Sequence, residues 1–161
     1  MVIDIEALSE EITELEKSGI DTKNIRISDR ATITFPFHRL EDNLEEDRLG
    51  GAAFGSTRRG IAYAYGERYQ KKSIQLGELF YPDDLKKRIT DLVNWKNMLF
   101  KNVYQSKEVL SPDDILKWVN NFGDKIKHFV CDTTDILEES AANGKKILFE
   151  AKLGSLRDIY L

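Results

Sequence analysis

The stretch from Gly55 to Gln75 holds the side chains best suited to bind an anion. Gly55 and Gly60 enclose Ser56 and Thr57 in a turn, and five basic residues accompany one acid in a chain of net charge −4. Glycine lets backbone N–H groups approach a ligand, hydroxyls donate, and guanidinium groups match phosphate oxygens. These residue types predict a phosphate site. The basic residues are Arg58, Arg59, Arg68, Lys71 and Lys72.

A second interpretation of this stretch stays open, namely a flexible loop followed by a solvated basic helix. The Walker phosphate-binding motif does not occur in the sequence. Nucleic-acid binding by the patch from Arg58 to Lys72 is disfavoured because the whole chain is acidic and no aromatic-interleaved surface motif supports it. We therefore expect no nucleic-acid partner.

The composition fits one ordinary domain over residues 1–161. The chain has a mass of 18.5 kDa and 41% apolar residues, which is enough for a core. Its apolar runs are too short to span a membrane, and no secretory leader is visible. The single cysteine, Cys131, excludes an internal disulfide and a multi-cysteine zinc site. These features predict a cytoplasmic protein without a membrane partner.

Helix signals are clearest at the start of the chain. Asp4 is suited to cap a helix from Ile5 to Lys17, and Gly19 is suited to end it. Alternating residues then predict two short strands, over residues 24–28 and 31–35.

Pro36 begins a charged helix whose acidic residues are predicted to form a solvated face rather than a metal site. These acids are Glu41, Asp42, Glu45, Glu46 and Asp47. Pro82 begins a long helix with a buried apolar stripe.

A second long helical stretch begins at the cap Ser111, with Gly123 as a candidate bend and Gly144 as its end. The apolar run from Ile147 to Phe149 predicts a strand buried on both faces. The expected architecture is a mostly helical α/β piece. Two long helices pack as a pair beside a small, partly parallel sheet, with the run from Ile147 to Phe149 as its central strand.

Several segments, in order along the chain, resemble the adenylosuccinate synthetase family. The resemblance is carried by Val2-Ile3-Asp4, Ile27-Ser28-Asp29-Arg30-Ala31, Phe35-Pro36-Phe37-His38-Arg39, Gly55-Ser56-Thr57-Arg58-Arg59-Gly60-Ile61, Ala64-Tyr65, Gly77-Glu78-Leu79-Phe80 and Gly144 to Glu150. It extends to Leu153-Gly154 and Leu156-Arg157-Asp158. Together these segments span nearly the whole chain.

The resemblance implies a C–N bond-forming ligase of purine nucleotide biosynthesis, specifically of AMP. The family joins inosine monophosphate (IMP) to aspartate, uses GTP and magnesium, and forms homodimers. It phosphorylates the 6-oxygen of the base before the aspartate amine displaces that phosphate. The match begins after the family's nucleotide loop and its catalytic aspartate and histidine. It therefore places no catalytic residue and no metal ligand in this chain, and we expect the isolated chain to be inactive.

The resemblance also implies an IMP site. Thr57 takes the position that binds the nucleotide phosphate, and Lys71 that of an arginine which reaches this phosphate from the partner subunit. Lysine keeps the charge but loses the bidentate fork. Ser56, Arg59 and Leu153 are weaker candidates near the nucleotide, and Leu153 replaces a family glutamine that contacts it.

The departures from the family pattern leave an alternative function open. Tyr63 replaces a family proline, and Thr32 stands where many members have histidine. A truncated, non-catalytic relic that persists as a helical binding or interaction module would show such changes.

Overall fold

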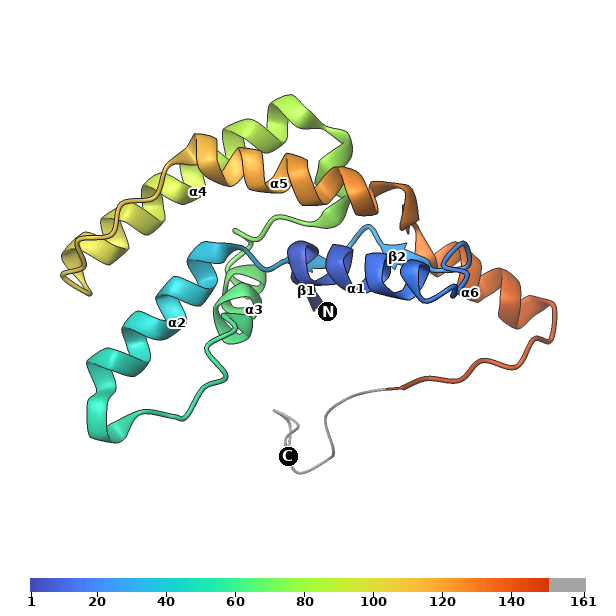
Figure 1. The fold of residues 1–161 in the computed structure, drawn as a ribbon, viewed down its shortest axis with the longest axis horizontal. Coiled ribbons are helices and arrows are strands. Elements are labelled where there is room, and N and C mark those ends of the chain that lie inside the picture. Colours follow the sequence, from blue (N-terminus) through green and yellow to red (C-terminus); the bar gives the residue numbers. More distant parts are fainter. Residues whose placement is uncertain (151–161) are drawn as a thin grey trace. The chain divides into compact units, whose positions relative to one another are not determined.

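The computed structural model describes residues 1–150 (Figure 1). Within it the chain forms two compact units, one from Met1 to Cys131 and one that begins at Asp132. Helices dominate residues 1–150, and the strands there are short and parallel. The predicted fold class, mostly helical with a small parallel sheet, is confirmed. No helix among the described residues is long and apolar enough to cross a membrane.

Four strands of two residues each pair in the first unit. β1 (Val2–Ile3) runs parallel to β3 (Thr32–Ile33), with Val2 opposite Thr32. β2 (Ile27–Ser28) runs parallel to β4 (Val130–Cys131), with Ile27 opposite Val130. Both predicted strands of this region are present, but they are shorter than the alternating pattern suggested.

Helix α1 (Ile5–Lys17) forms where its cap signals place it. The Asp4 carboxylate accepts hydrogen bonds from the backbone N–H groups of Glu6 and Ala7, at 3.2 and 3.3 Å. Gly19 follows the helix with φ of +78°, a left-handed conformation that favours glycine. These local interactions explain why the sequence alone predicted both ends.

Helices α4 (Pro82–Asn102) and α5 (Pro112–Ile126) run side by side, as predicted (Figure 1). The Asn97 side chain fastens the loop between them, because it accepts from the Leu110 N–H at 2.8 Å and donates to the Leu110 oxygen at 2.9 Å. Helix α5 also packs along α1. The core between these helices is filled by apolar side chains that include Ile12, Leu85, Ile89, Val93, Phe100, Ile115, Val119 and Ile126.

The helical stretch predicted from Ser111 is divided, and Gly123 does not divide it. Helix α5 continues through Gly123 to Ile126, and the 3-10 turn η3 (Lys127–Phe129) leads into β4. The backbone leaves the helix because β4 must pair with β2, about a hundred residues earlier in the chain. In the second unit, Asp132 caps α6 (Thr133–Ala142).

The predicted strand from Ile147 to Phe149 is wrong. Residues 145–150 form neither helix nor strand, and the side chains of Leu148 and Phe149 are 93% and 79% exposed. A strand buried on both faces needs paired neighbours and covering elements. Among residues 1–150 the strands form two sheets of two strands each, and the apolar run pairs with neither. Gly144 does end the preceding helix, with φ of +66°.

The remaining elements of the first unit surround the predicted phosphate site. Helix α2 (Pro36–Leu49) is followed by the 3-10 turn η1 (Gly50–Ala52) and the loop of residues 53–60. Helix α3 (Ile61–Tyr69) follows, and η2 (Leu76–Phe80) precedes α4. Helix α2 packs against α3.

Candidate functional site

The turn that contains Thr57 is held to helix α2 by a carboxylate. Ser56 Oγ donates to Asp42 Oδ1 at 2.5 Å, and the Gly60 N–H donates to Asp42 Oδ2 at 2.9 Å. The Arg58 N–H donates to Ser56 Oγ at 2.8 Å. One carboxylate therefore fixes both ends of the turn.

A second carboxylate, one helical turn further along α2, holds the start of the loop. The two oxygens of Glu46 accept from the N–H groups of Phe54 and Gly55, both at 3.1 Å. The loop thus directs backbone donors inward to protein carboxylates. The sequence predicts that such glycine N–H groups bind a phosphate, but those of Gly55 and Gly60 already donate to Glu46 and Asp42.

The predicted solvated acidic face of α2 is wrong for three of its five acids. Glu41, Asp42 and Glu46 are buried, with exposed fractions of 7%, 5% and 6%. Asp47 is exposed and pairs with Arg58, whereas Glu45 is partly buried and pairs with Arg48. The buried acids were missed because their partners lie 8 to 55 residues away along the chain.

Thr57 and Arg59 are left exposed by this arrangement. The Thr57 hydroxyl makes no hydrogen bond to any described residue, whereas that of Ser56 is engaged twice. Arg59 lies close enough to Arg39 to affect it: burial lowers the pKa of Arg39, and the positive charge of Arg59 lowers it further. Of the two turn hydroxyls, that of Thr57 is the one free to meet a ligand.

Gly60 is required by the geometry of the turn. Its φ is +71°, and a Cβ at this position would lie 2.4 Å from the backbone carbon of His38 and 2.6 Å from the nitrogen of Arg39. No L side chain fits such a contact without movement of α2. The close approach seats the turn directly on the first turn of α2.

A buried ionic chain, which sequence reasoning missed, joins helices α2, α3 and α4. Lys96 Nζ lies 2.5 Å from both Glu41 Oε2 and Glu67 Oε1. Glu67 Oε2 lies 2.9 Å from His38 Nε2, and His38 Nδ1 accepts from the Phe35 N–H at 3.0 Å. Position 96 falls on the apolar stripe of α4, between Leu92, Val93 and Phe100. A lysine on such a stripe is the sequence feature that could have indicated a buried ion pair.

The protonation states follow from this geometry. Burial lowers the pKa of His38 below its ordinary value of 6.5, against the opposing effect of Glu67. The ring is therefore neutral near pH 7, with Nε2 donating to Glu67 because Nδ1 is an acceptor. Burial alone would raise the pKa of Glu67, but the His38 hydrogen bond and the Lys96 charge bring it below its ordinary range.

Lys71 lies directly beyond the C-terminal end of α3, in a left-handed conformation with φ of +61°. It lines an open groove of about 460 Å³ with Arg68, Ser73, Gln75, Glu78 and Arg88. Arg68 donates to the Arg30 oxygen at 2.8 Å, and Arg88 donates to the Ser73 oxygen at 2.9 Å and to Glu78. Among the described residues the Lys71 ammonium has no partner. Thr57 is not part of this groove.

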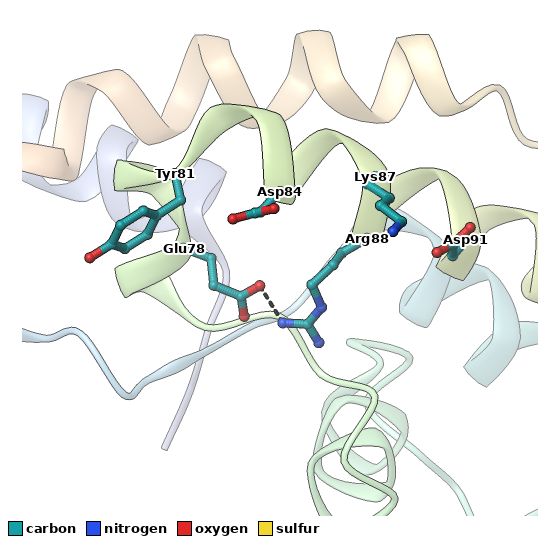
Figure 2. Close-up of a pocket in the computed structure, with 6 residues that line it drawn as sticks. All are labelled: Glu78, Tyr81, Asp84, Lys87, Arg88 and Asp91. Atoms are coloured by element: carbon teal, nitrogen blue, oxygen red, sulfur yellow. Dashed lines mark hydrogen bonds and ion pairs between the residues drawn. The ribbon is translucent and has the colours of Figure 1, made fainter.

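A second hollow of about 470 Å³ adjoins this groove and shares Glu78 and Arg88 with it. Figure 2 shows Arg88, a residue of α4, directed toward Glu78 of η2. The hollow combines acidic and basic side chains, so neither charge dominates. Its other lining residues are Tyr81, Asp84, Lys87 and Asp91.

Two further predictions concern Leu153 and metals. Leu153 lies outside the residues that the structure describes. Within residues 1–150, no group of three or more His, Cys, Asp or Glu side chains is arranged to hold a metal ion.

The fold is that of a known class of nucleotide ligase. The structure matches the fully ligated adenylosuccinate synthetase of Plasmodium falciparum with a TM-score of 0.76 over 91% of this chain and 33% of that one, at 24% sequence identity. At that identity the likeness establishes the fold.

Sequence comparisons establish the family. The family model for adenylosuccinate synthetase matches residues 1–161. Adenylosuccinate synthetase 2 of Pseudoalteromonas translucida is 43% identical over 160 residues, and the synthetase of Thermoanaerobacter sp. is 38% identical over 161 residues. The chain belongs to the adenylosuccinate synthetase family. The two matches include 99% and 100% of this chain, but the chain spans only 38% of the length of each relative.

Proposed function

We propose that this chain supplies the IMP-phosphate site of an adenylosuccinate synthetase, the GTP-dependent ligase that joins IMP and aspartate in the biosynthesis of AMP. The observation that carries the proposal is the turn of Gly55 to Gly60, which combines the family motif with a single unpartnered hydroxyl on Thr57. A hydroxyl held in this way can donate to a phosphate oxygen.

In the proposed role, Thr57 binds and orients while the chemistry occurs at the far end of the nucleotide. The family phosphorylates the 6-oxygen of the base and then displaces that phosphate with the aspartate amine. Reactions of this type depend mainly on positioning and on charge neutralisation. Holding the 5′-phosphate supplies positioning without any proton transfer by Thr57.

We further propose that Lys71 acts on the nucleotide of a partner subunit in a homodimer. Its free ammonium and its separation from the Thr57 turn, at the other end of α3, support this placement. An ammonium retains the charge that attracts a phosphate but cannot form the bidentate contact of an arginine.

Magnesium and GTP complete the family reaction, and we assign no residue of this chain to either. The described residues contain no cluster suited to a metal ion, so none of the steps proposed here involves it. The chain spans 38% of the length of its relatives, and we propose that it binds IMP without completing the reaction by itself. The substrates are soluble metabolites, and we therefore place the protein in the cytoplasm.

Calorimetry with IMP tests the site. Thr57→Ala should weaken binding by about 1 kcal/mol or more, because one hydrogen bond to a charged phosphate is lost. Thr13→Ala, on the exposed face of α1, is the matched control and should bind like the unmodified chain. Inosine, which has no phosphate, should not distinguish Thr57→Ala from the unmodified chain.

Equal IMP affinities for the unmodified chain and Thr57→Ala would remove Thr57 from the site. A chain that binds no IMP at all would instead favour the alternative function, a helical interaction module without catalysis.

A further inference from the structure

Two buried acids of helix α2 accept four hydrogen bonds from the loop that carries Thr57. Glu46 accepts from the Phe54 and Gly55 N–H groups, and Asp42 accepts from the Ser56 hydroxyl and the Gly60 N–H. Both carboxylates are more than nine-tenths buried. Buried acceptors of this kind are costly unless they are satisfied, and here each receives two hydrogen bonds.

The contacts of Asp42 have a particular geometry. They fall on residues 56 and 60, on either side of the exposed segment 57–59. Within that segment, the Arg58 N–H returns to Ser56 Oγ, and the Arg58 guanidinium reaches Asp47 at 3.1 Å. Residues 57–59 therefore form a short arch with both ends attached to one carboxylate.

We propose that Asp42 is a positioning residue that holds this arch in the single arrangement that presents the Thr57 hydroxyl to a phosphate ester. Ligand groups that are fixed before binding lose less conformational freedom when the ligand arrives. Without Asp42, residues 57–59 keep their side chains but lose their orientation. The identity of the ligand rests on the proposed function, whereas the attachment of the arch does not.

Three variants separate the positioning role from a general effect on folding. Asp42→Ala removes both acceptors. Asp42→Asn keeps one acceptor for the Gly60 N–H and can donate to Ser56 Oγ, so it should restore most of the arrangement. Ser56→Ala releases one end of the arch only, and it replaces Asp42→Ala if that variant fails to fold. Glu45→Ala, at a partly buried position of α2 that pairs with Arg48 and makes no hydrogen bond to the loop, is the control.

The first measurement is amide hydrogen exchange by NMR on the ligand-free chain. The Gly60 amide should exchange at least tenfold faster in Asp42→Ala, near the original rate in Asp42→Asn, and unchanged in Glu45→Ala. If the Gly60 amide of Asp42→Ala remained as protected as before, the attachment of the arch by Asp42 would be refuted, whatever the ligand.

The second measurement is a double-mutant cycle on IMP affinity. Asp42→Ala should weaken IMP binding at least fivefold, but should have no further effect once Thr57→Ala is present, because Asp42 acts through Thr57. The same loss in both backgrounds would overturn the positioning role. If the unmodified chain binds no IMP, the proposed function fails, and the exchange experiment alone then decides whether Asp42 holds the arch.

Discussion

The two ends of helix α3 are fastened by opposite charges. Before its first residue, the acids Asp42 and Glu46 bind the donors of the Thr57 turn. At its other end, Arg68 in the last turn of α3 and Arg88 of α4 bind the backbone oxygens of Arg30 and Ser73. At each end a candidate ligand-binding group has no partner among the described residues, the Thr57 hydroxyl at one end and the Lys71 ammonium at the other.

The two ends are alike in backbone strain. The turn places Arg58 in the left-handed region at φ of +55°, beside Gly60 at +71°, and the groove places Lys71 there at φ of +61°. A residue with a side chain is disfavoured there by about 1–2 kcal/mol. Each end therefore accepts strain at one basic residue.

The largest expected effect comes from breaking the buried ionic chain that joins α3 to α2 and α4. Lys96→Met leaves Glu41 and Glu67 buried without a cation, so the free energy of unfolding should fall by about 3–5 kcal/mol. Urea denaturation measures the loss. Lys101→Met, on the exposed side of the same helix, should change stability by less than about 0.5 kcal/mol.

The reverse experiment replaces the whole ionic group. The triple variant Glu41→Gln, Glu67→Gln and Lys96→Met should recover part of the stability, because no charge is left unpaired. A single Lys96→Met variant as stable as the original chain would show that the ionic chain does not join the helices.

The second effect concerns the turn alone. Gly60→Ala adds a Cβ in contact with the α2 backbone and should cost about 3 kcal/mol through strain and displacement. Gly55→Ala is the matched control, since it has the same φ of +71° but nothing within 4 Å of its Cβ. It should cost about 1 kcal/mol. Equal losses in thermal unfolding would mean that backbone conformation, and not the close approach to α2, governs Gly60.

The third effect is a loss of stability in mild acid, which should destabilise both ends of α3 together. The pKa of His38 is lowered in the folded chain by burial, so the unfolded chain binds a proton more readily. Above pH 6.5, His38 should therefore make no difference to how the free energy of unfolding depends on pH. As the pH decreases below 6.5, the free energy of unfolding should decrease by at most about 1.4 kcal/mol per pH unit.

A pair of histidine variants checks the origin of that loss. His38→Gln keeps a donor for Glu67 and should remove the loss between pH 6.5 and the lower pKa of folded His38. The same substitution at the exposed His128 should leave the pH profile as it was. Identical profiles for both variants would assign the acid sensitivity to other groups.

The smallest effect tests strain in the groove. Lys71→Gly should stabilise the chain by about 0.5 kcal/mol, because relief of the left-handed strain slightly exceeds the entropy cost of glycine. It should also weaken phosphate binding in a dimer. Gln105→Gly, at φ of +53°, should give the same gain in stability with no change in phosphate affinity. Loss of affinity in both variants would exclude a specific role for Lys71.

Much of the helical framework could be predicted because its signals are local. Asp4, Pro36, Pro82 and Ser111 act within one helical turn of the helix starts that they mark. The family motif around Thr57 is likewise a continuous segment. Such features can be recognised from the identity of neighbouring residues alone.

The strand from Ile147 to Phe149 shows where this reasoning ends. An apolar run specifies that burial is favourable but not which neighbours are present to provide it. The opposite error occurred at Val130 and Cys131, which were assigned to a helix and instead pair with β2. Both outcomes depend on segments that are distant in the sequence.

The sequence by itself determined the starts of α1, α2, α4 and α5, the predominance of helices and the membership of a ligase family. Only the tertiary structure decided that Asp42 and Glu46 are buried, that they occupy the donors of the glycine turn, and that Thr57 and Lys71 stay free. Caps and turns act over three or four residues, whereas the partners of a buried charge are brought to it only when the chain folds.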